Sequence, residues 1–266
     1  MKLEPVTGKR SIHLGDADAR LEGSFPTGGA LARQTAQAVE RIGDLQKILY
    51  ADGRHALLIV MQGRDASGKD GAIRTVFSAV NPQGCSVASF GAPTEFEQRH
   101  DYLWRIHAHV PPKRMIGIFN RSHYEDILVP RVRDTLPKDV WSKRYDQINE
   151  FERMLSADGV TILKFFLHVS RDEQKGRLRE RMTDPTKNWK VRKSDFEDRA
   201  LWDDFTKAYT AVLARTSTKW APWYVVPADD KAVRDWLIAR EIARALKKLN
   251  LRYPLADPAL LALTLE

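Results

Sequence analysis

Short apolar runs alternate with stretches of helical periodicity along most of this chain. Residues 56–62 are a short continuous apolar run, which is typical of a buried strand. Further strands are predicted over residues 115–119, 161–169 and 223–226, and residues 87–90 are a fifth candidate. Between these runs, apolar side chains recur every three or four residues, which is typical of an amphipathic helix. Strands that alternate with helices predict an α/β fold with a parallel sheet and right-handed crossovers.

The helical stretches and the breaks between them favour a single domain. Helices are predicted over residues 31–50, 69–80, 95–109, 140–155, 171–183, 195–215 and 231–249, with a further helix after residue 119 that Pro130 interrupts. Thr94 and Glu97 have the spacing of a capping box at the start of the third of these helices. Residues 184–194 lack periodicity and predict an exposed loop. We therefore expect an irregular N-terminal arm over 1–30, one domain over 31–250 and a C-terminal tail over 251–266.

The composition is that of a globular protein in a reducing compartment. Hydrophobic residues make up 43% and charged residues 29% of the 266 positions, which excludes a disordered chain. The single cysteine, Cys85, excludes a disulfide framework and a cysteine-based zinc site. The N-terminus has no apolar segment that would signal secretion, and no apolar run reaches the ~20 residues that span a bilayer. We expect a cytoplasmic protein that does not bind membranes.

The charge is unevenly distributed along the chain. Its net value of +8 points to an anionic partner. Residues 111–133 carry five basic and two acidic side chains, and residues 171–193 carry nine basic and four acidic ones. These two segments account for the whole excess, so the remainder of the chain is balanced. They are either solvated helix faces or parts of one anion-binding surface.

The strongest motif is the stretch GRDASGKD at residues 63–70, which fits the P-loop pattern G-x-x-x-x-G-K. A predicted strand comes directly before it and a predicted helix directly after it, as a P-loop requires. We expect the main chain of Gly63, Ala66, Ser67 and Gly68 to surround phosphate oxygens, with Lys69 supplying a charge for a terminal phosphate. The alternative is a glycine-rich turn that binds nothing.

Two aspartates make this P-loop unusual. Asp70 stands where a P-loop usually offers a Ser or Thr hydroxyl to Mg²⁺, and it is either a first-turn acid that the helix dipole stabilises or a part of the phosphate site. Asp65 lies inside the loop, where a carboxylate suits an anion site only if it holds Mg²⁺ or orients the attacking phosphate. We favour the dipole for Asp70 and a catalytic role for Asp65.

A second polar motif, NRSHYED at residues 120–126, directly follows the third strand. Ligands bind at the carboxyl ends of strands in open α/β sheets. Arg121 offers a planar fork to phosphate, while Asn120 stands where an acid that anchors Mg²⁺ is usual. Glu125 either restores that negative charge or belongs to an acidic pair at a helix N-terminus. His123 is expected to pack or to form a hydrogen bond rather than to act as a base.

The third motif is the basic helix 171–183 with the loop after it. Arg177 and Arg181 are four residues apart, so they share one helical face. They predict a lid over about residues 177–195 that brings arginines over the transferring phosphates. Lys187 and Lys190 lie in the loop of this lid. Trp189, between them in the sequence, is either exposed for stacking on a base or buried.

Four stretches together resemble the polyphosphate kinase 2 family, P-loop phosphotransferases related in fold to thymidylate kinase. They are GRDASGKDG at 63–71, FNRSHYEDILVPRV at 119–132, FFLHVSRDEQKGRLRERMTDPTKNWK at 165–190 and APWYVVPAD at 221–229. The resemblance covers roughly residues 30–250. It implies a P-loop kinase-like parallel sheet flanked by helices, Mg²⁺ as cofactor, and reversible phosphate transfer between inorganic polyphosphate and AMP, ADP or their guanine counterparts. It also implies a homo-oligomer, a dimer or a tetramer.

The resemblance further implies a role for individual residues. Asp65 corresponds to the metal-linked acid, Lys69 to the P-loop lysine and Arg121 to the arginine of the second motif. Arg177 and Arg181 correspond to the lid arginines. An aspartate at position 70 is normal for this family. Many members have Asp where this chain has Asn120, and the NRSHYED form resembles the subgroup that phosphorylates both nucleoside monophosphates and diphosphates, which makes Glu125 the substitute metal ligand.

The family resemblance also gives the charge a specific interpretation. A linear phosphate polymer carries charge at every unit and no base, so spaced lysines and arginines suffice to bind it. We expect Lys113, Arg131 and Arg133 to line a polyphosphate channel, together with Lys187 and Lys190. Two other functions stay open: an ATP-dependent nucleoside monophosphate kinase of the thymidylate kinase type, and a basic nucleic-acid-binding protein. The chain has neither an RNP-type strand nor a zinc finger, which argues against the second.

Overall fold

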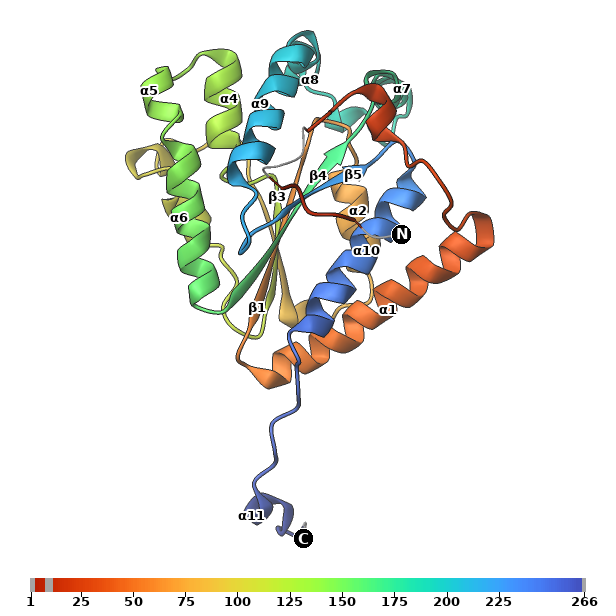
Figure 1. Cartoon of the computed structure of the whole chain (residues 1–266), viewed down its shortest axis with the longest axis vertical. Helices are drawn as coiled ribbons and strands as arrows, with labels where there is room; N and C mark the ends of the chain where they lie inside the picture. The colour runs from red at the N-terminus through yellow and green to blue at the C-terminus, as the bar shows by residue number, and fades with distance from the viewer. Residues whose placement is uncertain (1–2, 8–11, 265–266) are drawn as a thin grey trace.

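The computed structural model describes residues 3–7 and 12–264 and is built around a five-stranded parallel sheet (Figure 1). The strands are β1 (Ala56–Gly63), β2 (Cys85–Ser89), β3 (Ile116–Asn120), β4 (Val160–His168) and β5 (Trp223–Pro227). Their order in the sheet is β2-β3-β1-β4-β5, and every neighbouring pair is parallel. The predicted α/β fold with a parallel sheet is confirmed.

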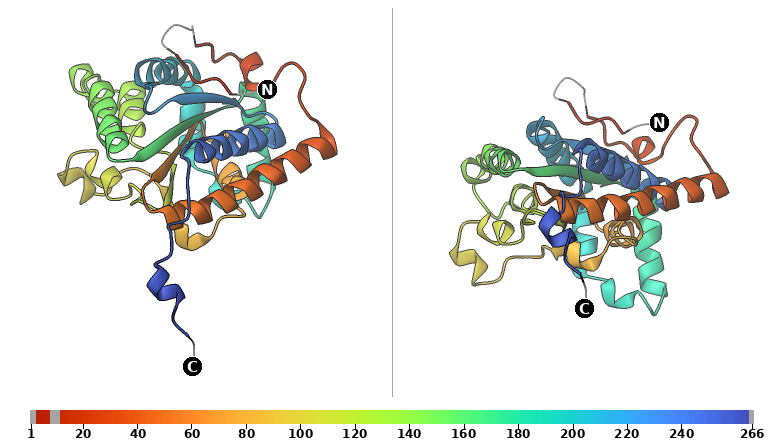
Figure 2. Two further views of the ribbon diagram at one scale, coloured as in Figure 1. Left: turned by 60° about the horizontal axis from the view of Figure 1, so that its bottom comes forward. Right: turned by 90° about the horizontal axis from the view of Figure 1, so that it is seen from below.

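Helices cover both faces of the sheet (Figures 1 and 2). The α-helices are α1 (Gly28–Asp52), α2 (Lys69–Val76), α3 (Trp104–His107), α4 (Glu125–Arg133), α5 (Lys138–Trp141), α6 (Arg144–Ala157), α7 (Arg171–Thr183), α8 (Lys193–Ala200), α9 (Trp202–Thr216), α10 (Lys231–Lys248) and α11 (Pro258–Leu261). Short 3-10 turns are η1 (Asp16–Ala19), η2 (Pro82–Gly84), η3 (Glu97–Arg99) and η4 (Asn188–Lys190).

Alternating side chains of β1 connect the sheet to two separate cores. Leu57 and Ile59 pack with apolar residues of α1, α2 and α10 on one face. Leu58 and Val60 pack with apolar residues of α4, α6 and α9 on the other face. Because β1 is central and covered on both sides, its residues 56–61 are all apolar, and the polar side chain of Gln62 comes just before the P-loop begins.

The prediction of one long helix over residues 95–109 is wrong, because this segment forms the turn η3 and the short helix α3 instead. The capping box does form, because Thr94 N donates to Glu97 Oε2 (2.7 Å) and Glu97 N donates to Thr94 Oγ1 (3.2 Å). It starts only the single turn η3, and α3 begins five residues later. In between, the Asp101 carboxylate accepts a hydrogen bond from Leu103 N at 2.9 Å. A side chain that binds the main chain in this way favours a turn over a continuous helix.

The prediction that Pro130 interrupts the helix after β3 is wrong, because α4 continues through this proline. A proline leaves the carbonyl four residues before it without a helical partner, and here that carbonyl belongs to Asp126. Arg144 of α6 supplies the missing donor, since its Nη1 lies 2.5 Å from Asp126 O. A contact from another helix therefore allows α4 to continue through the proline.

Other helix boundaries also differ from the prediction. Residues 195–215 form two helices, α8 and α9, which meet at Leu201. The helix expected to end at residue 80 ends at Val76, and the stretch expected over 140–155 is divided between α5 and α6. No helix in the described part of the chain is long and apolar enough to cross a membrane. The division into arm, domain and tail stays a prediction.

Candidate active site

The three polar motifs meet at the carboxyl edge of the sheet. β1 continues into the P-loop, β3 ends at Asn120, and β4 leads into α7. The strand register places Met61 beside Asn120 and Gly63 beside Leu167. Motifs that are far apart in the sequence are therefore neighbours at one edge, the position where open α/β sheets bind ligands.

Two glycines of the P-loop are required by their surroundings. Gly63 has a φ of 153°, and a Cβ there would lie 2.7 Å from the main-chain oxygen of Leu167. Gly68 has a φ of 97°, and a Cβ there would collide with the guanidinium of Arg234. A side chain at either position would therefore displace the loop, so glycine is needed for steric as well as conformational reasons.

Lys69 is the first residue of α2 and its side chain is buried. Its Nζ donates to the main-chain oxygens of Gly63 (2.7 Å) and Arg64 (3.1 Å), so the ammonium lies against the loop that precedes it. Burial lowers the pKa of Lys69 to about 8. The charge of this lysine is thus present at neutral pH and responds to a nearby anion.

Asp65 forms an ion pair with Arg121 across the site, with 2.5 Å between Oδ1 and Nη2. Burial by itself would raise the pKa of Asp65, but the charges of Arg121 and Lys69 outweigh it and hold the pKa below its ordinary value. Arg121 has a φ of 62°, and its N–H donates to Met61 O at 3.0 Å. This uncommon conformation turns the chain back toward β1 and brings the guanidinium to Asp65.

Glu125 faces the same pocket from the start of α4. Burial raises the pKa of its carboxyl, although the charges of Arg121 and Lys69 oppose that shift. The pocket has a volume of about 470 Å³, open solvent at its mouth included. It is lined by Gly63, Arg64, Asp65, Arg121, Glu125, Val129, Gln174, Asp198, Phe205 and Tyr209. Three acids and two cations therefore line one partly enclosed space.

Asn120 and Asp70 form a second contact between the first two motifs. Asn120 Nδ2 donates to Asp70 Oδ1 at 2.9 Å, and Lys190 Nζ lies 3.5 Å from Asp70 Oδ2. Burial opposes ionisation of Asp70, but Asn120 and Lys190 together keep its pKa below the ordinary value. Asn120 thus binds the acid of the P-loop helix, and Asp70 in turn contacts the lysine of the loop after α7.

Arg177 does not lie over the pocket, contrary to the prediction of a lid arginine. Its guanidinium is buried and donates to four main-chain oxygens, those of Ala66, Ser67, Ala228 and Asp229, at 2.7–3.1 Å. Its Nε donates to Glu173 Oε1 at 2.7 Å. Every donor of the side chain is used to join the P-loop to the loop between β5 and α10, so Arg177 holds the P-loop from behind.

The other basic residues of the predicted lid, and Arg133 of the predicted channel, have acidic partners nearby. Arg181 Nη1 lies 3.6 Å from Asp195 Oδ2, and its charge helps to lower the pKa of Asp65. Arg133 Nη2 lies 2.5 Å from Asp198 Oδ1 of α8. Lys187 pairs with acids of the same segment, since its Nζ lies 2.5 Å from Glu180 Oε1 and 2.9 Å from Asp184 Oδ2. The charge of Arg181 therefore acts on Asp65 in the pocket.

Two expected channel residues lie elsewhere. Lys113 precedes β3, at the amino edge of the sheet, and its Nζ is 3.9 Å from Asp158, just before β4. It is at the opposite end of the strands from the P-loop, so its assignment to a phosphate channel is wrong. Arg131 turns toward α5 and α6, where its Nη1 donates to Tyr145 Oη at 2.9 Å and its guanidinium lies over the ring of Trp141.

The sequence analysis missed two residues beside the P-loop. Arg234 of α10 is buried against Gly68 and pairs with Asp235 at 2.7 Å. Gln174 of α7 lines the pocket, and its Nε2 donates to Asp65 O at 3.0 Å. Arg234 lies outside the four family stretches, and Gln174 lies within the stretch 165–190 without an expected role. The packing of α7 and α10 brings both residues to the loop. The question left open for Trp189 is answered, because its side chain is exposed.

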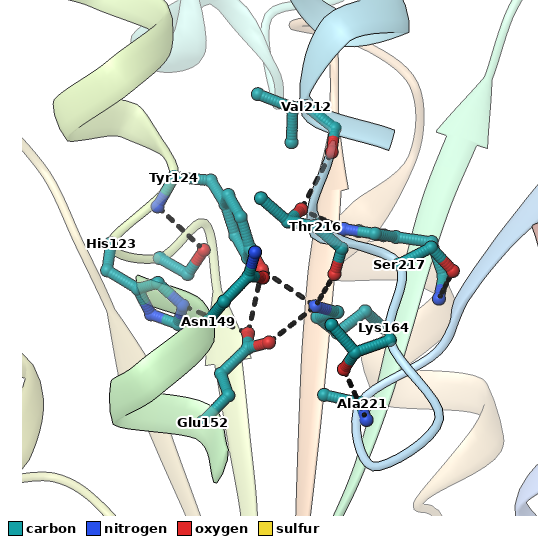
Figure 3. A network of polar contacts seen from close by, with 12 residues as sticks. His123, Tyr124, Asn149, Glu152, Lys164, Val212, Thr216, Ser217 and Ala221 are labelled. Carbon is teal, nitrogen blue, oxygen red and sulfur yellow. Dashed lines mark hydrogen bonds and ion pairs between the residues drawn. The ribbon is translucent and has the colours of Figure 1, made fainter. Parts of the chain in front are cut away.

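A buried polar network supports the second motif from behind (Figure 3). Lys164 Nζ of β4 donates to Tyr124 Oη (2.7 Å), Glu152 Oε2 (2.6 Å) and Thr216 O (2.7 Å). His123 Nε2 lies 3.2 Å from Glu152 Oε1, so this histidine forms a buried hydrogen bond, as expected. The network joins β4, α6 and α9 to the residues just before α4, and it thereby fixes the start of that helix.

Comparison with known proteins decides the family. A family model described as polyphosphate kinase 2 matches residues 29–254, well over half of the chain. The chain belongs to the polyphosphate kinase 2 family. The resemblance expected from four motifs is confirmed, and so is the expected enzyme class, a polyphosphate phosphotransferase of the polyphosphate kinase 2 type.

Relatives within the polyphosphate kinase 2 family match most of the chain. The AMP/ADP-polyphosphate phosphotransferase of Meiothermus ruber is 53% identical over 234 residues, which cover 87% of this chain and 88% of the relative. The ADP-polyphosphate phosphotransferase of Rhodopseudomonas palustris is 45% identical over 233 residues, covering 83% and 81%. The crystal structure of polyphosphate kinase 2 from Arthrobacter aurescens TC1 has a TM-score of 0.83 and 36% identity, and covers 96% and 95%.

Proposed function

We propose that this protein transfers the terminal phosphate of inorganic polyphosphate to AMP and ADP, or to their guanine counterparts. The observation that carries this proposal is the pocket at the carboxyl edge of the sheet, which Glu125 and the Asp65–Arg121 pair line. The ammonium of Lys69 lies behind it, against the main-chain oxygens of Gly63 and Arg64. The relative from Meiothermus ruber is named for both AMP and ADP, which supports both acceptors.

The reaction requires positioning and charge more than it requires a base. A phosphate oxygen of the nucleotide attacks the terminal phosphorus of polyphosphate, and the bond from that phosphorus to the oxygen of the next unit breaks. The attacking oxygen is already anionic, so no residue has to remove a proton. Lys69 and Arg121 stabilise the charge that moves to the bridging oxygen, and Arg181 adds a third positive charge when the lid closes.

Asp65 and Glu125 fit a magnesium ion. Among residues 3–7 and 12–264, no three His, Cys, Asp or Glu side chains gather into a metal site. Mg²⁺ is commonly held by one or two carboxylates while substrate phosphates and water complete its shell, so two facing carboxylates suffice. When bound, the ion would neutralise charge on the transferring phosphates. The low pKa of Asp65 keeps its carboxylate ionised and available as a ligand.

A matrix of donors and acceptors tests the proposal. Polyphosphate or ATP is combined with AMP, ADP, GMP or GDP, with Mg²⁺ or with EDTA, and the products are separated by chromatography. We expect product from polyphosphate with both AMP and ADP, and none with EDTA. If product forms with ATP as donor but not with polyphosphate, the protein is a kinase of the thymidylate kinase type, which contradicts the proposal. Activity on ADP but not AMP would contradict the pair of acceptors.

The Lys69→Ala variant is the matched control for this matrix. Loss of a charge that acts on the developing anion should lower kcat by at least about 100-fold. A basic nucleic-acid-binding protein would instead retain salt-sensitive binding of DNA or RNA in the same variant. The homo-oligomer, a dimer or a tetramer, stays a prediction that sedimentation velocity can check.

A further inference from the structure

Three aromatic rings form a cluster on the surface of the segment between β2 and β3. We call Phe96, His100 and Trp104 the aromatic platform. The rings of His100 and Trp104 are stacked, with centroids 4.2 Å apart and an interplanar angle of 10°. Phe96 packs edge-on against both, at 5.2 and 5.6 Å. Yet Phe96 is 59% and Trp104 40% exposed. Grouped exposed aromatic side chains are typical of a surface that binds something.

The aromatic platform is connected to the candidate active site. β2 leaves the sheet beside the end of β3, where Phe90 N donates to Asn120 O at 3.1 Å. Arg105, next to the platform, donates from Nη1 to Gly91 O at 2.9 Å, and its Nη2 lies 3.5 Å from Asp126 Oδ2. Asp126 is the residue after Glu125 in α4. The segment that bears the platform therefore begins at the catalytic edge and contacts the helix that carries Glu125.

Local hydrogen bonds hold the platform in place without a ligand. The capping box of Thr94 and Glu97 fixes one end of the segment, and Gln98 Nε2 donates to Pro93 O at 3.0 Å. Tyr102 Oη donates to Gln147 of α6 at 3.1 Å, which fixes the other end. Rings that are already ordered lose little conformational entropy on binding a ligand, so the platform is preorganised.

The chemistry of the platform selects between the two substrates. Polyphosphate has no apolar part, whereas a nucleotide carries a planar base. We propose that the exposed rings of Phe96 and Trp104 stack on the base of the acceptor nucleotide while its phosphate faces Arg121. This inference rests on the proposed function. Every base has a π face, so stacking of this kind accepts adenine and guanine alike.

Calorimetric binding of AMP and of ribose 5-phosphate tests this inference. The phosphate and the sugar are common to both ligands, so only the base distinguishes them. Phe96→Ala and Trp104→Ala should each raise the Kd for AMP by about 5- to 100-fold. The Kd for ribose 5-phosphate and the KM for polyphosphate should stay within about twofold of wild type, because neither ligand reaches the platform. Trp104→Phe, which keeps a ring, should recover most of the affinity for AMP.

The Tyr253→Ala variant is the matched control, since Tyr253 is a similarly exposed ring beyond α10. It should bind AMP as the wild type does. Unchanged AMP binding in both platform variants would overturn the inference, as would equal weakening of AMP and ribose 5-phosphate. A change of oligomeric state in sedimentation with AMP binding intact would also overturn it, and would assign the platform to a contact between subunits.

The same data separate this inference from the proposed function. A wild-type protein that transfers phosphate from polyphosphate, with platform variants that bind AMP normally, would retain the function and refute the platform. A wild-type protein that binds AMP through the platform but transfers nothing from polyphosphate would retain the platform and refute the proposed function.

Discussion

Lys69 shows how burial adjusts a single charge for its task. Its ammonium donates to two main-chain oxygens of the loop before it, at 2.7 and 3.1 Å, and burial brings its pKa down to about 8. Because the pKa in the folded protein is below that of a free lysine, folding disfavours the charged form. The resulting cost to stability is present below pH 8 and diminishes as the pH rises toward the pKa of the unfolded chain.

The pKa of Lys69 predicts the alkaline limb of the pH profile. The ratio kcat/KM reports groups of the free enzyme, so with polyphosphate as the varied substrate it should fall above pH 8, by about tenfold per pH unit. The kcat limb should lie at higher pH, because bound phosphates favour the charged lysine. In Lys69→Arg the limb near pH 8 should disappear. A limb that is unchanged in this variant would assign the titration to another group.

At the residue scale, similar side chains acquire different roles from their neighbours. Asp65 and Glu125 are both carboxylates at the pocket, yet the pKa of Asp65 is lowered and that of Glu125 is raised. Asp65 forms a direct ion pair with Arg121, whereas burial dominates at Glu125. Such opposed shifts within one site are typical of functional carboxylates.

At the element scale, α7 serves the site in two ways from one face. Arg177 joins the P-loop to the loop after β5 with all its donors, while Arg181, one turn later, extends toward Asp195 and the pocket. The two residues have the same chemistry and helical spacing. Only the elements that surround them differ, so main-chain oxygens bind Arg177 whereas Arg181 lies beside Asp195.

Paired substitutions separate these two roles. Arg177→Met leaves buried carbonyls unpaired, each at a cost of about 1–3 kcal/mol, so it should destabilise the protein by at least about 3 kcal/mol in urea unfolding. Arg181→Met should change stability by less than about 1 kcal/mol but lower kcat by at least tenfold. Equal losses of stability in the two variants would contradict this assignment, as would normal turnover in Arg181→Met.

Helix boundaries at this scale depend on contacts between elements. The break between α8 and α9 coincides with Trp202, whose ring lies 3.8 Å below the guanidinium of Arg64 in the P-loop. Arg64 Nη2 also donates to Trp202 O at 3.1 Å. The start of α9 is thereby attached to the phosphate loop, an arrangement that periodicity along residues 195–215 does not reveal.

At the scale of the whole molecule, the basic excess is divided between the two edges of the sheet. Lys190 and Arg181 lie at the carboxyl edge with the P-loop, whereas Lys113 lies at the amino edge beside Asp158. A polyanion at the P-loop therefore meets only part of the excess. Screening in salt limits the influence of charges farther away than about 10 Å.

This division predicts unequal effects of two single substitutions. At low ionic strength, Lys190→Ala should raise the KM for polyphosphate by about three- to tenfold, whereas Lys113→Ala should leave it within about twofold of wild type. The difference should shrink at high salt. Steady-state kinetics at two salt concentrations measure both variants. Equal increases of KM would show that the excess acts as a general field.

The sequence by itself determined the sheet and the chemistry of its edge. A P-loop is a local pattern, with glycines at fixed offsets between a strand and a helix, so Gly63, Gly68 and Lys69 can be identified without a structure. The alternation of strands and helices likewise determined a parallel sheet, because each crossover helix covers its own pair of strands. Family membership followed from four such local motifs in the right order.

Only the tertiary structure decided which cations face the pocket. A basic side chain takes its role from groups that other elements bring to it, such as the carbonyls of Ala66 and Ala228 around Arg177. The same holds for Pro130, which α4 accommodates because Arg144 of another helix pairs with the freed carbonyl. These partners are distant in sequence and carry no local pattern. Hydrogen bonds across the fold therefore distinguish residues that charge and spacing leave equivalent.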